Sequence, residues 1–237
     1  MTVLDVRDLR RSFGGIHAVQ GVSFTLEDQE VVGIIGPNGS GKSTMFNLLT
    51  GMVRPSSGTV LLGDRDITGW KPHRIARAGM GRTFQIPALF VNMTVRENLY
   101  ASVVEGDWKG ASERAELVLD LMKLGELRNE LAGALSGGQQ RLLEFGRILM
   151  RDPRVILLDE VTAGVHPDLR QTILGAITRL RSEGRSFLVI EHDMELVRAV
   201  CERVIVMDAG QVVARGSFDE IASDKNVVEA YLGMPVR

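Results

Sequence analysis

The sequence predicts an α/β protein whose parallel sheet is interrupted by a helical insertion. Two short apolar runs, "RVILLDE" and "SFLVIEH", flank a helical pattern, and strand–helix–strand units of this kind build parallel sheets. Residues 86–150 contain three helical patterns with no strand pattern between them. We therefore expect a single domain over residues 1–237, with a core from residues 1–85 and 151–237 and a helical subdomain from residues 86–150.

Strand patterns dominate the first sixty residues. Apolar side chains alternate in "GVSFTLE", which places Val22, Phe24 and Leu26 on one face of a strand. The segment "TVLLGDRDIT" is typical of a strand, a Gly-Asp turn and an edge strand. The apolar run "VVGII" then leads through a glycine-rich loop into "KSTMFNLLTG", whose helical spacing ends at Gly51.

The second half of the chain supplies the strand–helix–strand unit. Its two apolar runs are bounded by polar residues, as is typical of strands that are buried on both faces. Between them, Ile173, Ile177 and Leu180 fall on one side of the expected helix. Short helices are expected near the end of the chain, where Ser217 and Glu220 match a capping box.

The composition is that of an ordinary globular protein, with 44% hydrophobic and 24% charged residues. The net charge of −2 creates no overall basic field, so we expect no nucleic-acid partner. Cys201 is the only cysteine, which excludes an internal disulfide and fits a reducing compartment. The segment "MTVLDVRDLRR" lacks the apolar region of a signal peptide, and no apolar run reaches the roughly 18 residues of a membrane span. We expect a cytosolic protein that contacts a membrane only through a partner.

The stretch "GPNGSGKST" matches the pattern G-x-x-x-x-G-K-[ST] of a phosphate-binding loop. Glycines let backbone N–H groups point at phosphate oxygens, and the following helix presents its positive N-terminus. Lys42 would contact the β- and γ-phosphates, Ser43 would ligate Mg²⁺, and Thr44 would reach the α-phosphate. A plain glycine turn is the alternative, but the flanking strand and helix favour ATP or a similar triphosphate. The expected contacts are Gly36, Pro37, Asn38, Gly39, Ser40, Gly41, Lys42, Ser43 and Thr44.

Acidic residues and a histidine follow two later strands. Ligands of parallel sheets lie beyond the carboxyl ends of the strands, where Asp159, Glu160 and His192 are expected. Asp159 would hold Mg²⁺ through water, and Glu160 would orient or polarise the attacking water. A neutral His192 would hydrogen-bond the γ-phosphate and that water. The alternatives are an exposed acidic turn and a structural histidine.

The segment "LSGGQQRLLEFGRILM" predicts a second anion-binding turn. Ser136 and Gln139 match a capping box, and Gly137 and Gly138 would let an anion approach the helix N-terminus closely. A well-capped helix that binds nothing explains the same residues, and the pattern alone leaves both interpretations open.

The motifs "GPNGSGKST", "LSGGQQ", "ILLDE" and "VIEHD", in this order, resemble those of the ATP-binding subunits of ABC transporters over essentially the whole chain. The resemblance implies a RecA-like α/β core, an antiparallel β subdomain and a helical subdomain. It also implies that Ser136, Gly137 and Gly138 bind the γ-phosphate of a nucleotide held by a second ATPase subunit. Two chains would then enclose two ATP molecules.

Other roles are implied by the same resemblance. Gln85 in "GRTFQ" would contact Mg²⁺ and the attacking water, Glu160 would be the catalytic base, and His192 would be the switch histidine. Phe13 in "RSFGG" would stack on adenine, and the alternative is that Phe13 is a core residue of a strand. Phe24 is a poorer candidate because the alternating pattern of "GVSFTLE" places its side chain in a core. The resemblance implies that the metal ion is held by Ser43, Gln85 and Asp159.

Two positions depart from the family pattern. Val161 stands where a proline commonly follows the catalytic glutamate, and His166 replaces the aspartate of the next loop. We expect a looser loop after Glu160 and leave open the interface contact made at His166. The nucleotide and signature motifs are intact, so we expect an active site.

Within the family, "RSFGGIHAV", "GRTFQIPALFVNMTVRENL" and "LVIEHDMELV" resemble ATPases of branched-chain amino-acid uptake systems. Urea or amide importers and lipopolysaccharide exporters share parts of this pattern, and a soluble ABC ATPase is a further alternative. The expected partners are two membrane permease subunits and, indirectly, a solute-binding protein, with this subunit peripheral at the cytoplasmic face of the inner membrane. The permeases would dock near Gln85, in a groove that exposed side chains of Ile86, Pro87, Leu89 and Phe90 would line. The alternative is that these four side chains pack inside the protein.

Overall fold

The computed structural model describes residues 1–85, 88–103, 108, 110–224 and 227, and within them the strands form two sheets. The order of the six-stranded sheet is β10 (Gln211–Gly216), β9 (Arg203–Asp208), β3 (Val31–Ile35), β8 (Ser186–Ile190), β7 (Val155–Asp159) and β6 (Met80–Arg82). The order of the four-stranded antiparallel sheet is β2 (Ile16–Glu27), β1 (Thr2–Phe13), β4 (Ser57–Leu62) and β5 (Arg65–Asp66).

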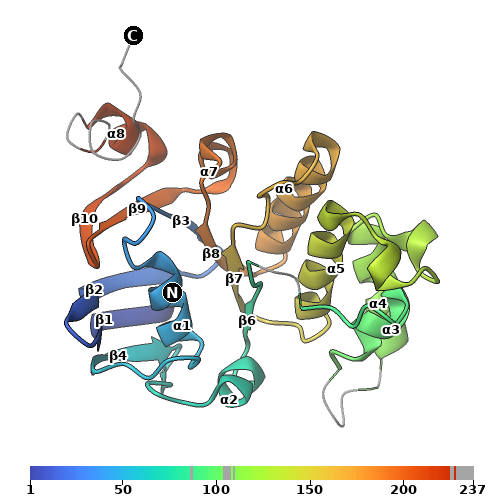
Figure 1. Cartoon of the computed structure of the whole chain (residues 1–237), viewed down its shortest axis with the longest axis horizontal. Coiled ribbons are helices and arrows are strands. Elements are labelled where there is room, and N and C mark those ends of the chain that lie inside the picture. Colours follow the sequence, from blue (N-terminus) through green and yellow to red (C-terminus); the bar gives the residue numbers. More distant parts are fainter. Residues whose placement is uncertain (86–87, 104–107, 109, 225–226, 228–237) are drawn as a thin grey trace.

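Helices cover the larger sheet on both faces (Figure 1). In chain order they are α1 (Lys42–Leu49), α2 (Pro72–Arg77), α3 (Val95–Tyr100), α4 (Ala111–Leu121), α5 (Gly137–Leu149), α6 (Pro167–Ser182), α7 (Met194–Val200) and α8 (Phe218–Ser223). Short 3-10 turns lie at Gly125–Leu127 and Ala132–Ala134. No helix in the described part of the chain combines the length and apolar character needed to cross a membrane.

The larger sheet is parallel from β9 to β6 and separates two hydrophobic cores. Alternate side chains of a strand point to opposite faces, so Val32 and Ile34 join the core with α1 and the antiparallel sheet, whereas Val31 and Ile35 face the helices. Every residue of β3, β7 and β8 is buried, as the continuous apolar runs predict. Full burial of one such side chain stabilises the fold by about 1.5–3 kcal/mol.

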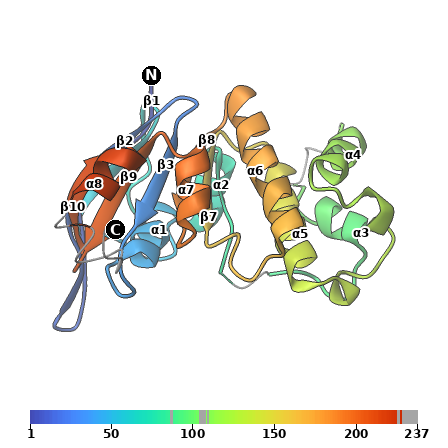
Figure 2. The same cartoon turned by 90° about the horizontal axis from the view of Figure 1, so that it is seen from above.

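The smaller sheet packs its apolar face against α1 (Figure 2). Val22, Phe24 and Leu26 are all buried there, which confirms the alternation in β2. A turn at residues 63–64 joins β4 to β5, as expected. The predicted α6 face is also confirmed, because its three apolar side chains are buried in the other core. The capping boxes at Ser136 and Ser217 are both present.

Between β6 and β7 the chain forms α3, α4 and α5. Helix α5 contacts α6 on one side and both α3 and α4 on the other (Figure 2). Gly146 permits the close approach of α4, because a Cβ there would lie 2.8 Å from the Val118 side chain. These helices share one hydrophobic core with the α6 face of the sheet.

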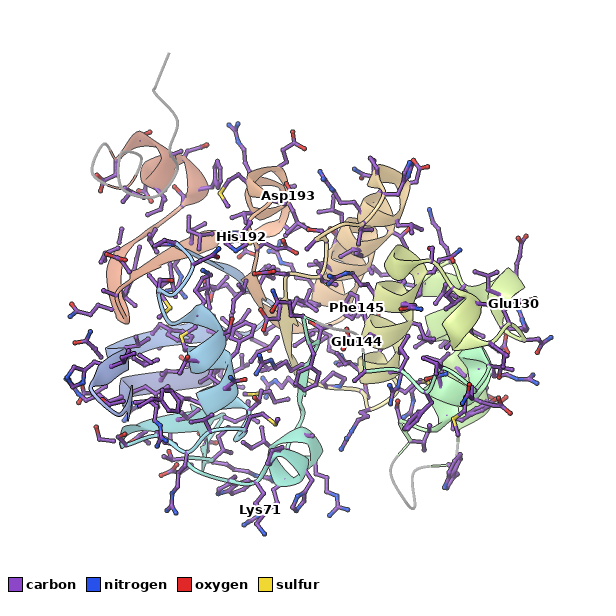
Figure 3. All side chains as sticks on the ribbon, in the orientation of Figure 1. Lys71, Glu130, Glu144, Phe145, His192 and Asp193 are labelled. Carbon is purple, nitrogen blue, oxygen red and sulfur yellow. The ribbon has the colours of Figure 1, made fainter. Side chains whose placement is uncertain are left out.

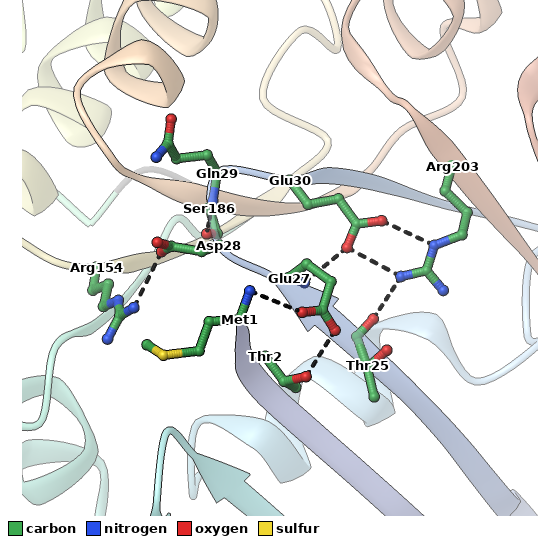
Figure 4. Close-up of polar contacts among 10 residues, drawn as sticks. All are labelled: Met1, Thr2, Thr25, Glu27, Asp28, Gln29, Glu30, Arg154, Ser186 and Arg203. Atoms are coloured by element: carbon green, nitrogen blue, oxygen red, sulfur yellow. Dashed lines mark hydrogen bonds and ion pairs between the residues drawn. The ribbon is translucent and has the colours of Figure 1, made fainter.

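Charged contacts fasten the amino-terminal ends of the strands, at the edge opposite the glycine-rich loop (Figure 4). Arg203, the first residue of β9, donates from Nε to Glu30 Oε1 at 2.9 Å and from Nη2 to Glu30 Oε2 at 3.1 Å. Its Nη2 also donates to the backbone carbonyl of Thr25 at 2.7 Å. This half-buried ion pair therefore joins the start of β9 to the turn between β2 and β3.

A buried acid joins α5 to the segment after β6. Glu144 lies on α5 (Figure 3), is only 6% exposed, and accepts a hydrogen bond from the backbone N–H of Phe84 at 3.1 Å. Burial raises the pKa of the Glu144 carboxyl to about 7, although hydrogen bonds from the backbone of Phe84 and Ala88 oppose the shift.

This raised pKa predicts a pH-dependent stability. Folded protein keeps the proton up to about pH 7, whereas the unfolded chain releases it near pH 4.5, so the stabilising contribution is lost as pH rises between these values. At about 1.4 kcal/mol per pKa unit, roughly 2–3 kcal/mol should be lost between about pH 5 and about pH 8. Urea unfolding of the wild type and of Glu144→Gln at several pH values measures this loss of stability, which the variant should lack. Parallel pH profiles of the two proteins would contradict the prediction.

Candidate functional site

The loop between β3 and α1 needs glycine at two positions for steric reasons. Gly36 has a φ of 147°, and a Cβ there would lie 2.0 Å from the carbonyl oxygen of Met207. Gly41 has a φ of 100°, and its Cβ would lie 2.3 Å from the carbonyl oxygen of Ala18. Both contacts are far shorter than van der Waals separation, so the loop can fold this closely against β2 and β9 only with glycine.

Lys42 folds back over this loop. Its Nζ donates to the carbonyl oxygens of Gly36 at 2.8 Å and Pro37 at 3.0 Å. Burial lowers the pKa of Lys42 below its ordinary value, and the charges of Glu160 and Asp159 oppose that shift. The Lys42 ammonium is therefore held at the centre of the loop in a site that favours an anionic partner.

A cavity of about 540 Å³ opens over the loop and gathers most of the predicted residues. Its lining residues are Ile16, His17, Ala18, Gln20, Asn38, Gly39, Ser40, Gly41, Lys42, Ser43, Thr44, Gln85, Glu160 and Ala209. At its wall, the hydroxyl of Ser40 is buried without a hydrogen-bond partner. The cavity is a polar, lysine-centred site of the size of a small organic ligand.

Three predicted catalytic side chains meet at Glu160. Gln85 Nε2 donates to Glu160 Oε2 at 3.1 Å, and His192 Nε2 lies 3.2 Å from Glu160 Oε1. His192 follows β8 and lies beside α7 (Figure 3). The structure therefore brings Gln85 and Glu160 together although they are more than 70 positions apart in the sequence.

The backbone at Glu160 is held in an unusual conformation. Its φ is 49°, in the left-handed region that a non-glycine residue rarely adopts. The Glu160 N–H donates to the Ile190 carbonyl at 2.9 Å, and its own carbonyl accepts from Arg141 Nη1 at 2.9 Å. Strain of this kind persists where neighbours fix the chain on both sides, and it concentrates at functional sites.

Asp159 lies at the predicted strand end but has a partner that the sequence did not indicate. Its Oδ2 accepts from Arg82 Nη2 at 2.8 Å, and its backbone N–H donates to Thr83 Oγ1 at 2.9 Å. Asp159 is not among the described residues that line the cavity. Its carboxylate is therefore placed behind the cavity wall, paired with an arginine.

The glycine turn at the start of α5 lies away from this cavity. Ser136 accepts from the Gln139 N–H and Gln139 accepts from the Ser136 N–H, so the cap is complete. Ser136 and Gly137 are exposed, and neither they nor Gly138 line the cavity in the described part of the chain. The turn therefore exposes Ser136 and Gly137 to solvent and does not face the loop of its own chain.

Phe13 is 44% exposed, which argues against the alternative of a core strand residue. The guanidinium of Arg11 lies 4.7 Å from the centre of its ring. Ring and cavity are neighbours along the β1–β2 hairpin, because Ile16, which pairs with Phe13, lines the cavity.

The four residues expected near the permease-docking surface differ in their placement. Ile86 and Pro87 lie outside the described residues, Leu89 packs against the core, and Phe90 is 50% exposed.

A second cavity of about 530 Å³ lies between α2, β6 and α5, next to the Gln85 segment, with Phe84, Glu144 and Arg147 among its walls.

The two departures from the family pattern also have defined places. Val161 is 2% exposed and belongs to the helix-side core. His166 is the N-cap residue of α6, and its Nδ1 accepts from the Asp168 N–H at 3.4 Å.

Sequence reasoning missed three charged residues that hold the site. Arg82 pairs with Asp159, and Arg141 donates to the Glu160 backbone. Glu191 is 2% exposed and accepts from the Thr162 N–H at 2.9 Å, which ties the two strand-end loops together. Only Glu191 carried a signal in the sequence, as a charge directly after a predicted buried strand, whereas Arg82 and Arg141 carried none because their partners come from distant segments.

Comparison with known proteins agrees with this geometry. A family model described as ABC transporter matches residues 19–163. The chain is 39% identical to the high-affinity branched-chain amino acid transport ATP-binding protein BraF of Pseudomonas aeruginosa over 249 residues, with 98% of each chain covered. It is 38% identical to the LivG protein of Escherichia coli, a high-affinity branched-chain amino acid transport ATP-binding protein, again with 98% of each covered.

Solved structures share the fold. A nucleotide-free ATP-binding cassette from an ABC transporter has a TM-score of 0.90 at 36% identity and covers 99% of this chain and 100% of its own. Another ATP-binding cassette, in its ADP conformation, has a TM-score of 0.87 at 36% identity, with 99% and 100% covered. The expected RecA-like core with an antiparallel sheet and helices is therefore confirmed. The chain belongs to the ABC transporter family, among its ATP-binding proteins.

Proposed function

We propose that this chain is the ATP-hydrolysing motor subunit of a membrane importer for branched-chain or related amino acids. ATPase activity follows from its family. The observation that carries the proposal is the convergence of Gln85 and His192 on Glu160 at the mouth of a lysine-centred cavity. The named relatives, which are branched-chain amino acid transport proteins, support the substrate class.

The cavity fits a magnesium triphosphate. Phosphate oxygens would satisfy the unpartnered Ser40 hydroxyl and replace the loop carbonyls as partners of Lys42. Mg²⁺ is usually held by one or two protein oxygens together with substrate phosphates. Ser43 and Gln85, which line the cavity, would supply them, and Asp159 would hold the ion through water. When bound, Mg²⁺ would neutralise the charge that develops on the transferred phosphoryl group. Phe13 would stack on adenine at the open end.

Glu160 would orient and polarise the attacking water. Its carboxylate is fixed at one oxygen by Gln85 and faces His192 at the other, so its direction is set before the nucleotide arrives. His192 would then hydrogen-bond the γ-phosphate. A prepositioned general base of this kind contributes roughly 10²–10⁴-fold to the rate.

A second copy, or a related subunit, would complete each site. Ser136 and Gly137 of the Ser136–Gly138 turn are exposed at a capped helix N-terminus, where anions bind readily, yet the turn lies outside the cavity of its own chain. It would contact the γ-phosphate bound to the partner subunit. A structure described as a dimeric post-hydrolysis cassette bound to ADP and Pi, with a TM-score of 0.80 at 25% identity, supports this arrangement.

Two permease subunits would place this protein at the cytoplasmic face of the inner membrane. The cavity between α2, β6 and α5 would receive a permease segment, because it lies beside Phe84 and therefore next to Gln85. A solute-binding protein would act on the outer side through the permeases. Urea or amide import and lipopolysaccharide export remain the alternatives, and no relative named above favours them.

Cells in which this gene is deleted should test the transported substrate. Uptake of labelled leucine at low external concentration should fall about tenfold or more, because import would lack its ATPase. Urea and acetamide uptake should stay unchanged. Normal leucine uptake together with lost urea uptake would replace the proposed substrate with an amide.

Replacing the proposed base should separate binding from turnover. Glu160→Gln keeps the size of the side chain and should lower ATP-dependent phosphate release by at least about 100-fold while ATP still binds. ATP should then trap a dimer, seen as a doubled mass by light scattering. Phosphate release that survives this change would remove Glu160 from the proposed role.

A paired variant tests the contact from the second subunit. Ser136→Arg should leave ATP binding by the monomer within about twofold but prevent the dimer in the Glu160→Gln background, because an arginine would fill the γ-phosphate position of the partner site. Ser217→Arg removes the same kind of helix cap from α8, at a cost of about 1 kcal/mol, and should still dimerise. Loss of ATP binding by isolated Ser136→Arg monomers would disprove the assignment to the second subunit.

A further inference from the structure

The ion pair between Arg82 and Asp159 differs from the others in its burial. The two side chains are 8% and 5% exposed, and their closest atoms are 2.8 Å apart. Among ion pairs between described residues, no other has both side chains less than a tenth exposed. Pairs of this kind are costly to bury and very costly to break, so a buried pair at the edge of the site is a candidate for a functional role.

Arg82 is anchored independently of Asp159. Its Nη1 donates to Asn47 Oδ1 at 2.6 Å, on α1, and to Thr50 Oγ1 at 3.3 Å, at the C-cap of that helix. Its guanidinium also lies 5.4 Å from the ring centre of Phe46. The positive charge is therefore fixed to the helix that carries the phosphate loop, and it would stay near the end of β7 even without its carboxylate partner.

On the other side, the guanidinium lies 5.3 Å from the ring centre of Phe84, the residue before Gln85. Arg82 does not line the loop cavity in the described part of the chain; it lines the neighbouring cavity between α2 and α5. Arg82 therefore acts on a nucleotide only indirectly, and Asp159 is its charged partner at the site.

Without Arg82, Asp159 would be a buried negative charge with no ion-pair partner, close to the loop that receives phosphates. Such a charge repels a triphosphate strongly in a poorly solvated site, unless a cation lies between them. A divalent cation supplies that compensation only while it is bound. Arg82 supplies it permanently, from a position fixed by α1.

We propose that Arg82 is a positioning residue that holds and neutralises the Asp159 carboxylate whenever no divalent cation is bound, so that the loop accepts a nucleotide without Mg²⁺. The proposal rests on the proposed function, in which Asp159 holds the Mg²⁺ of a bound triphosphate through water. It gives a role to the buried arginine partner of the carboxylate nearest the proposed metal position.

Calorimetric titration of ATP, in Mg²⁺ and in EDTA, tests the proposal without measuring turnover. Arg82→Gln should weaken ATP binding in EDTA about tenfold or more and by less than about threefold in Mg²⁺. Asp159→Asn added to Arg82→Gln should restore binding in EDTA, because the uncompensated charge is then gone. Arg82→Lys should also bind ATP in EDTA almost as wild type does.

A matched control is the half-buried ion pair of Arg203 and Glu30, which also lies at an end of the larger sheet. Arg203→Gln breaks the Glu30 pair at the opposite edge of the sheet and should weaken ATP binding equally little in both buffers. Thermal melts establish that each variant is folded. If Arg82→Gln does not fold, Asp159→Asn alone decides, because the surplus charge of Arg82 should tighten ATP binding in EDTA by about threefold or more.

Two results would overturn the inference while leaving the proposed function intact. One is equal weakening of ATP binding by Arg82→Gln in Mg²⁺ and in EDTA, with no rescue by Asp159→Asn. The other is wild-type protein that binds ATP in Mg²⁺ but not in EDTA. Failure of the proposed function looks different, since wild-type protein would then bind no ATP in either buffer.

Discussion

Parallel pairing of β3, β8 and β7 is the constraint on which the site depends. Ile34 on β3 and Asp159 on β7 both pair with Ile190 on β8, so the three strands end at the same level. The phosphate loop, Glu160 and His192 follow these ends directly and must meet at one edge of the sheet. A slip of one residue would exchange the two buried faces of a strand, so the two hydrophobic cores hold this register.

The elements best predicted from sequence are those whose local pattern carries their tertiary role. The strands β3, β7 and β8 are continuous apolar runs because both faces are buried, and β2 alternates because only one is. The short strand β6 gives no such signal, since its three residues, from Met80 to Arg82, end in a charge. In β10 the side chains alternate between exposed and half-buried, as befits an edge strand, so its apolar pattern is weak.

The candidate site also contains features that the sequence predicts and features that it does not. The phosphate loop was predictable because its glycines and lysine follow one another closely in the sequence, and Gly36 and Gly41 are required where the loop meets β9 and β2. The partners of Asp159 and Glu160 were not, because Arg82 and Arg141 come from β6 and α5 and meet them only in the folded chain. Spacing along the sequence carries no information about such approaches. The left-handed backbone at Glu160 is likewise a result of tertiary hydrogen bonds, since glutamate has no local preference for it.

Helix α5 connects the separate parts of this site through two polar contacts one turn apart. Arg141 holds the carbonyl of Glu160, and Glu144 accepts from the backbone of Phe84, the neighbour of Gln85. The exposed turn at Ser136 is the N-terminus of the same helix. Because a helix is stiff over this length, a displacement of that N-terminus must either move the Glu160 and Gln85 segments with it or break buried hydrogen bonds at a cost of about 1–3 kcal/mol each.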